Sequence, residues 1–288
     1  MPNDLDISEA ITYSTAFIKC AIAGERVSLG TGFFIDVHSQ DGKIITLLVT
    51  NKHVIKGTIF TEFEVCKANK DNKPIDNETV SFHFNSSLWT PHPDPNVDLC
   101  CIPVSAIDEY RCLSDLGKKC FVSSLQLALI PTKEELNHLM ALEEVIMVGY
   151  PHGFWDEYNH KPIIRRGITA SHPNKDFSGK KETLLDIAMF PGSSGSPVFI
   201  VNPCFHMDNR NFLSRQKRVF FLGIAHEDCT KRENIYLSFF NTLKTIFCVK
   251  IKAHMNLALM IKSERILDFE KMIQNGEIRT SPEGNIGE

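Results

Sequence analysis

Residues 190–197, FPGSSGSP, place three serines and two glycines between prolines. A serine hydroxyl is a weak nucleophile, so it needs a neighbouring general base, and that base needs an acid that orients it. Acyl transfer also requires N–H groups aimed at the oxyanion that develops. Gly192 can adopt conformations that other residues avoid, which would let the N–H groups of Gly192 and Ser194 converge. The segment is therefore either a surface loop or a turn that presents Ser194 as a nucleophile.

Eleven histidines could supply the base. His53 differs from most of them because it lies in LLVTNKHVIKG (47–57), where an apolar run ends in polar residues. A histidine at the end of a packed strand is rigidly held, as a general base must be. The alternative is a histidine whose ring is satisfied in the core or in a turn. Several others lie in polar turns: His38, His92, His160, His172 and His206.

The candidate for the orienting acid is Asp98, in PNVDLCCIPV (95–104). A carboxylate directly before a strongly apolar strand is costly to desolvate unless it is paired. The alternative is that Asp98 caps the turn that follows PDPN. The order of the three candidates along the chain is His53, Asp98 and Ser194.

The elements that must position these residues are mainly strands. Short runs rich in Val, Ile, Phe and Thr recur through the first 250 residues, separated by Gly, Asn, Asp and Pro clusters, which is typical of strands and turns. Examples are GTGFFIDV (30–37), KIITLLVTN (43–51), VIMVGY (145–150) and VFFLGIAH (219–226). Many short strands without regular helices between them favour antiparallel barrels or a sandwich.

The predicted organisation of the chain is a single domain built from two β units. The first unit spans 12–108 and the second 144–248, joined by a connector at 109–143. Within that connector, PTKEELNHLMALEE (131–144) has Thr132 followed by Glu135, a capping-box pattern, so it predicts a helix. A second helix is predicted within 249–276, over residues 253–276, and a flexible polar tail at 277–288.

Composition and charge exclude several function classes. The net charge of −4 gives no reason to expect nucleic acid or an anionic membrane as a partner. The first residues do not resemble a secretory signal, and no apolar run is long enough to span a membrane. Nine cysteines without a C-x-x-C pair indicate reduced thiols in a cytoplasmic protein, with no metal site and no cofactor.

The candidate residues lie in motifs that resemble those of a known family. LLVTNKHVI, VDLCCIPV and DIAMFPGSSGSPV are similar to the His, Asp and Ser motifs of trypsin-fold (chymotrypsin-like) serine peptidases, in the order that this fold uses. GTGFFI, VGYPHGF (148–154) and RGITAS (166–171) resemble segments of the HtrA-like branch, and Asp186 stands where that branch commonly has aspartate. The resemblance covers about residues 28–226.

This resemblance implies an all-β fold of two six-stranded antiparallel barrels, with the site in the cleft between them. It implies that Ser194 is the nucleophile, His53 the general base and Asp98 the residue that orients His53. Gly192 and Ser194 would supply the oxyanion N–H groups. The expected activity is that of a serine endopeptidase acting on proteins or peptides. The alternative is a catalytically latent module of the same fold that serves in protein interactions.

Two departures from the family bear on regulation. Secreted, zymogen-type members keep an aspartate just before the nucleophile, whereas this chain has Ser193 there and lacks an Ile-Val-Gly-Gly N-terminus. We therefore expect no activation by N-terminal cleavage. We expect regulation by a protein partner or by ordering of the oxyanion loop instead, with stress response or phage (antiviral) defence as settings. Only about 40 residues follow the last predicted strand, which is too few for the PDZ domain of typical HtrA proteins.

Substrate preference is read from three further positions. In the resembling fold, the pocket for the side chain before the scissile bond has its floor near Ala188 and Met189. These apolar residues predict an aliphatic or aromatic side chain there rather than Arg or Lys. His226 is expected on or near the strand that pairs with substrate; the alternative is a structural histidine.

Overall fold

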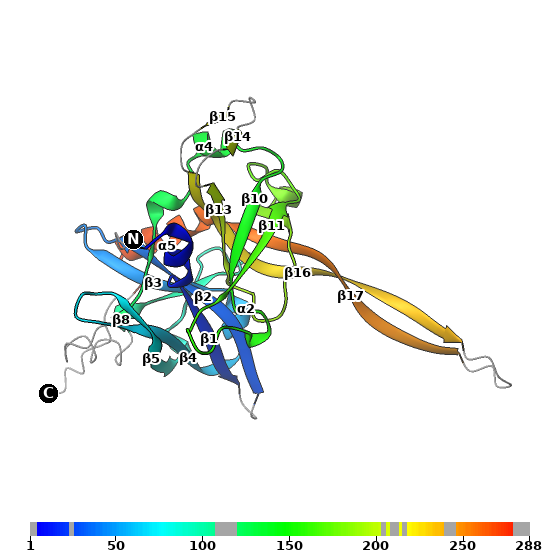
Figure 1. The fold of residues 1–288 in the computed structure, drawn as a ribbon, viewed down its shortest axis with the longest axis horizontal. Coiled ribbons are helices and arrows are strands. Elements are labelled where there is room, and N and C mark those ends of the chain that lie inside the picture. The colour runs from blue at the N-terminus through cyan, green and yellow to red at the C-terminus, as the bar shows by residue number, and fades with distance from the viewer. Residues whose placement is uncertain are drawn as a thin grey trace.

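The computed structural model describes residues 5–22, 26–106, 120–202, 206–207, 213–214, 218–238 and 246–278. Strands dominate it, as predicted (Figure 1). The first half forms one sheet with the strand order β5-β4-β1-β2-β3-β7-β6, in which β8 also pairs with β4 and β9 with β2. Its strands are β1 Thr15–Ile22, β2 Arg26–His38, β3 Ile44–Thr50, β4 Thr58–Ala68, β5 Pro74–Asn85, β6 Thr90–Pro91, β7 Cys100–Pro103, β8 Cys120–Phe121 and β9 Leu125–Gln126.

The second half closes into the six-stranded barrel that was predicted, in the order β10-β11-β12-β17-β16-β13. Its strands are β10 Glu144–Gly149, β11 Ile163–Thr169, β12 Glu182–Asp186, β13 Pro197–Asn202, β16 Arg218–Ser238 and β17 Ile246–Lys262. A small separate pair is formed by β14 His206–Met207 and β15 Leu213–Ser214. Beyond the barrel, β16 and β17 continue as a long two-stranded ribbon that projects from the rest of the molecule (Figure 1).

The sheet of the first half has nine strands where we expected six. The additional strands are short: β6, β8 and β9 have two residues each. Two of them lie in the expected connector, where they add to β4 and β2. This arrangement satisfies main-chain groups of the connector that would otherwise need other partners.

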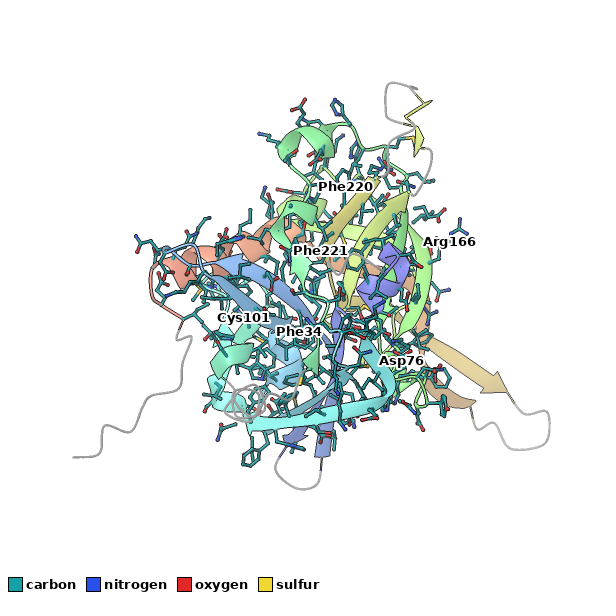
Figure 2. All side chains as sticks on the ribbon, turned by 60° about the vertical axis from the view of Figure 1, so that its left-hand side comes forward. Phe34, Asp76, Cys101, Arg166, Phe220 and Phe221 are labelled. Atoms are coloured by element: carbon teal, nitrogen blue, oxygen red, sulfur yellow. The ribbon has the colours of Figure 1, made fainter. Side chains whose placement is uncertain are left out.

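Alternate residues of β2 and β3 serve two different cores, which explains the consecutive apolar residues 33–35 of β2 and 47–49 of β3. Phe34 and Leu48 point into the core of the first sheet, with Ile18, Phe63 and Phe82. Their neighbours face a core shared by the two halves of the chain. That shared core includes Phe33, Ile35, Leu47, Val49, Val148, Phe199, Phe221 and Phe269. Figure 2 shows Phe34 and Phe221 in the interior, whereas Asp76 and Arg166 lie at the surface.

The predicted helices are present but shorter than expected. The connector helix α4 spans only Lys133–Asn137, and its capping box between Thr132 and Glu135 is formed as the sequence indicated. The prediction over 131–144 was wrong beyond Asn137, because Leu139 packs into the barrel core and Glu143 pairs with the buried Arg218. Residues 107–119 of the connector lie outside the described residues.

The prediction of a helix from residue 253 was also wrong. The run to Lys262 is strand β17, which closes the barrel between β12 and β16. Its alternate residues Ala258 and Met260 are fully buried in the barrel core, so a two-residue period operates where we inferred a helical one. The second unit therefore ends at Lys262 instead of residue 248. The C-terminal helix α5 spans Ile266–Gln274, and the tail beyond residue 278 lies outside the described residues.

The remaining helices are short. They are α1 Ile7–Thr12, α2 Lys52–Ile55, and the 3₁₀ turns η1 Ser86–Leu88, η2 Val104–Ala106, η3 Leu127–Leu129, η4 Pro151–Gly153, η5 Phe177–Gly179 and η6 Ser263–Arg265. None of the helices in the described ranges has the length and apolar character needed to cross a membrane.

Candidate active site

His53 and Asp98 are held together at the end of β3. The strand ends at Thr50, Asn51 caps α2, and His53 lies in the first turn of that helix. The Nδ1 atom of His53 lies 2.5 Å from Oδ2 of Asp98, and the His53 main-chain N–H donates to Oδ1 over 3.1 Å. Asn51 Nδ2 donates to the Asp98 carbonyl oxygen over 2.7 Å. Two hydrogen bonds thus hold the Asp98 carboxylate against His53, and a third holds the Asp98 main chain.

The loop before Asp98 is fastened to the same helix. The Lys52 ammonium lies 3.2 Å from the carbonyl oxygen of Asp94 and 3.3 Å from that of Pro95. Directly after Asp98, β7 pairs with β3, with Cys100 opposite Thr50. The pairing of this apolar strand with β3 therefore places Asp98 near the end of β3, where α2 carries His53.

The segment 190–197 forms a tight turn between barrel strands. The N–H of Ser193 donates to the Phe190 carbonyl oxygen over 2.9 Å, and that of Ser196 to the Ser193 carbonyl oxygen over 3.0 Å. Gly192 and Gly195 have φ values of 91° and 90°, which side-chain-bearing residues rarely adopt. A Cβ on Gly195 would lie 1.9 Å from the Thr31 carbonyl oxygen, so only glycine fits this close approach.

Two N–H groups of this turn have no acceptor. Among the residues that the structure describes, neither the Gly192 nor the Ser194 amide donates a hydrogen bond to the protein. These are the two groups that the sequence indicated as oxyanion donors. Ser194 itself is half-buried, whereas Ser193 and Ser196 are buried. The turn therefore brings together one half-buried serine and two unused donors.

Thr31 joins the turn to the first sheet. Its N–H donates to the Ser194 carbonyl oxygen over 2.8 Å, and its hydroxyl donates to the Gly192 carbonyl oxygen over 2.8 Å. The same hydroxyl accepts the Tyr150 N–H at 3.1 Å. Thr50 donates through Oγ1 to the Thr31 carbonyl oxygen over 2.8 Å. A short chain of hydrogen bonds thus runs from Thr50, at the end of the strand that leads to His53, to the turn that carries Ser194.

Sequence reasoning did not identify Thr31 or Thr50. Both side chains are completely buried. The only available signal was a threonine inside each of the apolar runs GTGFFI and LLVTN, since a buried hydroxyl needs a hydrogen-bond partner.

Three residues were predicted to determine substrate preference: Ala188, Met189 and His226. Met189 is buried in the barrel core, 3% exposed, and Ala188 is half-buried. His226 lies in β16 with Nε2 3.6 Å from Oε1 of Glu182, and its side chain is 11% exposed. Its neighbour Ala225 exchanges main-chain hydrogen bonds with Gly195 and Ser196. His226 thus follows directly the segment that pairs with the turn.

Cysteine chemistry does not compete with Ser194 at this site. Burial raises the pKa of the Cys100 thiol well above its ordinary value, and burial also raises that of Cys101. Such thiols are poor nucleophiles because the thiolate is the reactive form. The described residues also contain no group of three or more His, Cys, Asp or Glu side chains that could hold a metal ion.

Comparison with known proteins shows the family of this chain. The family model of the trypsin-like peptidase domain matches residues 30–202, more than half of the chain, a range that contains His53, Asp98 and Ser194. No curated protein matches the chain.

Solved structures match over most of their length at low identity. The thermostable serine protease AL20 from an extremophilic microorganism is 11% identical, with 91% of this chain and 97% of that one covered, at a TM-score of 0.46. GrC is 13% identical over 94% of this chain and 97% of its own, at 0.49. Deg5 is 14% identical, with 78% of this chain and 88% of Deg5 covered, at a TM-score of 0.41. On the family match, the chain belongs to the trypsin-like peptidase domain family.

Proposed function

We propose that the protein is a serine endopeptidase that cuts polypeptides through an acyl-enzyme intermediate. The observation that supports this proposal best is the pairing of His53 with Asp98, together with a turn, bonded to the same sheet through Thr31, whose Gly192 and Ser194 amides are unused. Each catalytic need of a serine nucleophile (a base, an acid that orients it and oxyanion donors) has a candidate in this arrangement.

In the proposed reaction, Ser194 Oγ attacks the scissile carbonyl carbon while His53 Nε2 takes the hydroxyl proton. Asp98 accepts a hydrogen bond from the Nδ1–H of His53, so that Nε2 is left free to act as the base, and the carboxylate stabilises the imidazolium that forms. The Gly192 and Ser194 N–H groups bind the oxyanion. The imidazolium then protonates the leaving amine, and water hydrolyses the acyl ester by the same proton transfers in reverse.

Ser193 supports the absence of zymogen activation. Its side chain is 1% exposed, and its Oγ accepts the Phe190 N–H at 3.4 Å within the same turn. The Ser193 hydroxyl has its hydrogen-bond partner within the turn and needs no charged partner from a new N-terminus. We propose that the turn is preformed and that a protein partner restrains the enzyme instead.

The proposed setting is the cytoplasm, with stress response or phage defence as the process served. Support for the compartment comes from thiols: Cys20, Cys66, Cys100, Cys101 and Cys120 are free cysteines. Reduced, buried thiols are typical of cytosolic proteins. The process itself rests on the sequence-based expectation alone.

A second candidate function is a latent module that binds polypeptides without cutting them. One observation favours it: within the described residues, the Ser194 hydroxyl makes no hydrogen bond, not even to His53. Catalytic hydrogen bonds in unliganded enzymes are often long and tighten only when substrate binds. We therefore rank the peptidase first.

The two functions are separated by incubating the full chain with an unfolded protein and detecting new N-termini by mass spectrometry. We expect cleavage by the wild type and none by Ser194→Ala. If both proteins capture the unfolded chain equally and neither cuts it, with or without cytoplasmic extract as a source of partners, the latent module is correct.

A further inference from the structure

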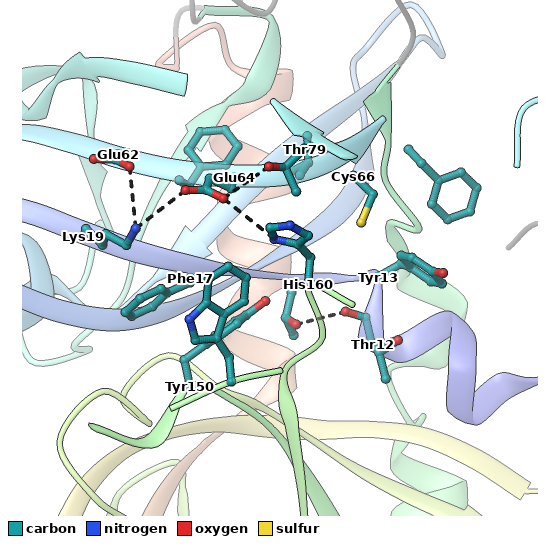
Figure 3. Close-up of a pocket in the computed structure, with 15 residues that line it drawn as sticks. Thr12, Tyr13, Phe17, Lys19, Glu62, Glu64, Cys66, Thr79, Tyr150 and His160 are labelled. Atoms are coloured by element: carbon teal, nitrogen blue, oxygen red, sulfur yellow. Dashed lines mark hydrogen bonds and ion pairs between the residues drawn. The ribbon is translucent and has the colours of Figure 1, made fainter. Parts of the chain in front are cut away.

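A second pocket lies on the outer face of the first sheet, beneath the segment that links β10 to β11 (Figure 3). Three aromatic side chains form one wall of it, which we call the aromatic wall: Phe17, Tyr150 and Trp155. Phe17 stacks on Tyr150 with ring centroids 5.1 Å apart, and Trp155 lies 6.2 Å from Phe17. None of the groups assigned to the proposed reaction lines this pocket.

The opposite side of the pocket carries two carboxylates. Glu62 and Glu64 project from β4, with side chains 33% and 23% exposed. The Lys19 ammonium lies 3.7 Å from Glu62 and 3.6 Å from Glu64, both beyond hydrogen-bond distance (Figure 3). The lining thus carries two carboxylates and one ammonium, and Glu62 also lies 3.5 Å from Nε2 of His83 outside the pocket.

Glu64 is poorly satisfied for a half-buried carboxylate. It accepts one long hydrogen bond, 3.4 Å from the Thr79 hydroxyl, and lies 4.0 Å from Nδ1 of His160. A carboxylate has about four acceptor positions, and each one removed from water without a donor costs free energy. The pocket thus offers acceptors beside aromatic faces, the combination that attracts an organic cation.

The chain itself already places cations on aromatic rings in this region. Lys19 Nζ lies 5.3 Å from the ring centroid of Phe17, and Lys161 Nζ lies 3.2 Å from that of Tyr13. Lys19 is 35% exposed, and ion pairs of this kind contribute little to stability, so it can move into water when a better donor arrives.

The size of the pocket limits what can enter. Its volume is about 30 Å³. A single water needs about 10–15 Å³ on the same kind of measure, so the pocket holds the tip of a side chain rather than a cofactor. A guanidinium group fits the chemistry best, because it stacks on aromatic rings while its N–H fork binds a carboxylate with two hydrogen bonds.

The pocket is close to the candidate nucleophile. Thr31, whose N–H donates to the Ser194 carbonyl oxygen, lies on β2 opposite Phe17 of β1. Two residues further along β1, Lys19 lies between Leu29 of β2 and Glu62 of β4. Two strand spacings, about 10 Å, therefore separate β2 from β4, a length of about three extended residues.

Gly153 connects the two sites from the other side. A Cβ at Gly153 would lie 3.0 Å from Phe17 and 3.3 Å from Leu29. A Cβ at Gly192 would lie 3.2 Å from the Gly153 nitrogen. Close packing thus runs from the turn at residues 190–197 (the oxyanion turn), through the start of the β10–β11 segment, to the aromatic wall.

We propose that this pocket binds an arginine side chain of the substrate, about three residues from the scissile bond; this proposal rests on the proposed peptidase activity. The guanidinium stacks on the aromatic wall and donates to Glu64, while Lys19 turns outward. The pocket then selects substrates by a residue distant from the bond that is cut.

The test uses quenched fluorogenic peptides built on a sequence that the protein cleaves. Arginine is placed in turn at each position on both sides of the scissile bond, and citrulline, its uncharged analogue, replaces it in matched peptides. We expect arginine at one position to raise kcat/KM about tenfold over citrulline, the effect of a charge-assisted hydrogen bond. Lysine at that position should give a smaller gain.

The variant Glu64→Gln should reduce that arginine-to-citrulline ratio to about two, because the carboxylate charge is lost. The matched control is Glu78→Gln, which removes an exposed carboxylate on neighbouring β5 that pairs with Lys67 outside the pocket. It should leave the ratio unchanged. An equal ratio in Glu64→Gln and wild type would overturn the proposal.

Binding to Ser194→Ala separates this proposal from the peptidase proposal. Trp155 lines the pocket, whereas Trp89 is buried in the core of the first sheet, so the fluorescence of Trp155 reports occupancy. We expect the arginine peptide to change this fluorescence at about tenfold lower concentration than the citrulline peptide. Preferential binding without cleavage by the wild type would retain the pocket and contradict the peptidase. Cleavage without any arginine preference in either experiment would support the peptidase and overturn the arginine pocket.

Discussion

The main-chain N–H of Thr31 donates to the carbonyl oxygen of Ser194 over 2.8 Å, although 163 positions separate the two residues in the chain. Thr31 belongs to the first sheet and Ser194 to the turn before a strand of the second barrel. Because the Thr31 hydroxyl also holds the Gly192 carbonyl oxygen, this one residue sets where the oxyanion turn lies relative to His53.

Replacement of Thr31 by valine tests this positioning role. Thr31→Val leaves the Gly192 carbonyl without a donor and the Tyr150 N–H without an acceptor, so we expect about 1–3 kcal/mol of lost stability. We also expect kcat to fall at least tenfold with a smaller change in KM, since the oxyanion donors are displaced. Urea unfolding and peptide kinetics measure both.

The matched control is Thr183→Val. The Thr183 hydroxyl is buried and has no hydrogen-bond partner among the described residues, so its removal should leave stability unchanged or raised. Equal losses in the two variants would mean that the hydrogen bonds of Thr31 are unimportant.

Asp98→Asn tests the orientation of His53. Asp98 binds the His53 main-chain N–H with one oxygen and faces Nδ1 with the other, whereas the amide has only one acceptor oxygen. With that oxygen on the main-chain N–H, the amide NH2 donates to Nδ1, so the ring takes the wrong tautomer, and we expect kcat to fall by about four orders of magnitude. Asp94→Asn changes a carboxylate in the same loop whose oxygens bind Asn96 and Arg265, and it should reduce kcat much less. Comparable losses in both variants would contradict a specific role for Asp98.

Gly195→Ala tests the close approach between the turn and β2. The new Cβ would lie 1.9 Å from the Thr31 carbonyl oxygen at a φ of 90°, so we expect the turn to be displaced and activity to be lost. Gly57→Ala is the matched control, since its φ of 74° is similar and nothing lies within 4 Å. It should cost only about 1 kcal/mol of backbone strain, measured by thermal unfolding. Full activity in Gly195→Ala would show that the packing of the turn is looser.

His92 makes stability depend on pH. Its side chain is fully buried between Phe269 and the Arg265 carbonyl oxygen, and burial lowers the pKa of the ring below its ordinary value. In the unfolded chain the ring binds a proton below about pH 6.5, so the unfolded state binds more protons and the free energy of unfolding falls as the pH drops.

His92→Gln removes this titration and can still donate to the Arg265 carbonyl oxygen. We expect the loss of stability between pH 7.5 and 5.5 to be smaller in the variant than in the wild type. The dependence should persist in part, because burial also lowers the pKa of His172. Denaturant titrations at several pH values measure it, and identical slopes in the two proteins would contradict the assignment.

The sequence predicted His53, Asp98 and Ser194 because each lies at a boundary between an apolar strand and a polar turn. The pocket floor expected near Met189 stays a prediction; residues 186–189 alternate, and Ile187 and Met189 both face the barrel core. The sequence-based prediction failed at β17, because LALMI is apolar enough for a helix and only the barrel's need for a sixth strand decides between the two.

The second pocket could not be predicted at all. Phe17, Glu64 and Trp155 lie on three segments, and register and loop packing bring them together. Thr31 illustrates the same limit within the candidate site. Its partners Gly192 and Tyr150 are more than 100 positions away, so no local pattern indicates them.

The most direct test of the central claim is covalent labelling of the full chain with a fluorophosphonate, followed by peptide mapping. Only a serine that is activated by a base and flanked by oxyanion donors reacts rapidly with such a reagent. We expect a single adduct on Ser194, absent in Ser194→Ala and strongly slowed in Asp98→Asn. An adduct on another residue, or none in folded protein with any partner present, would contradict the account.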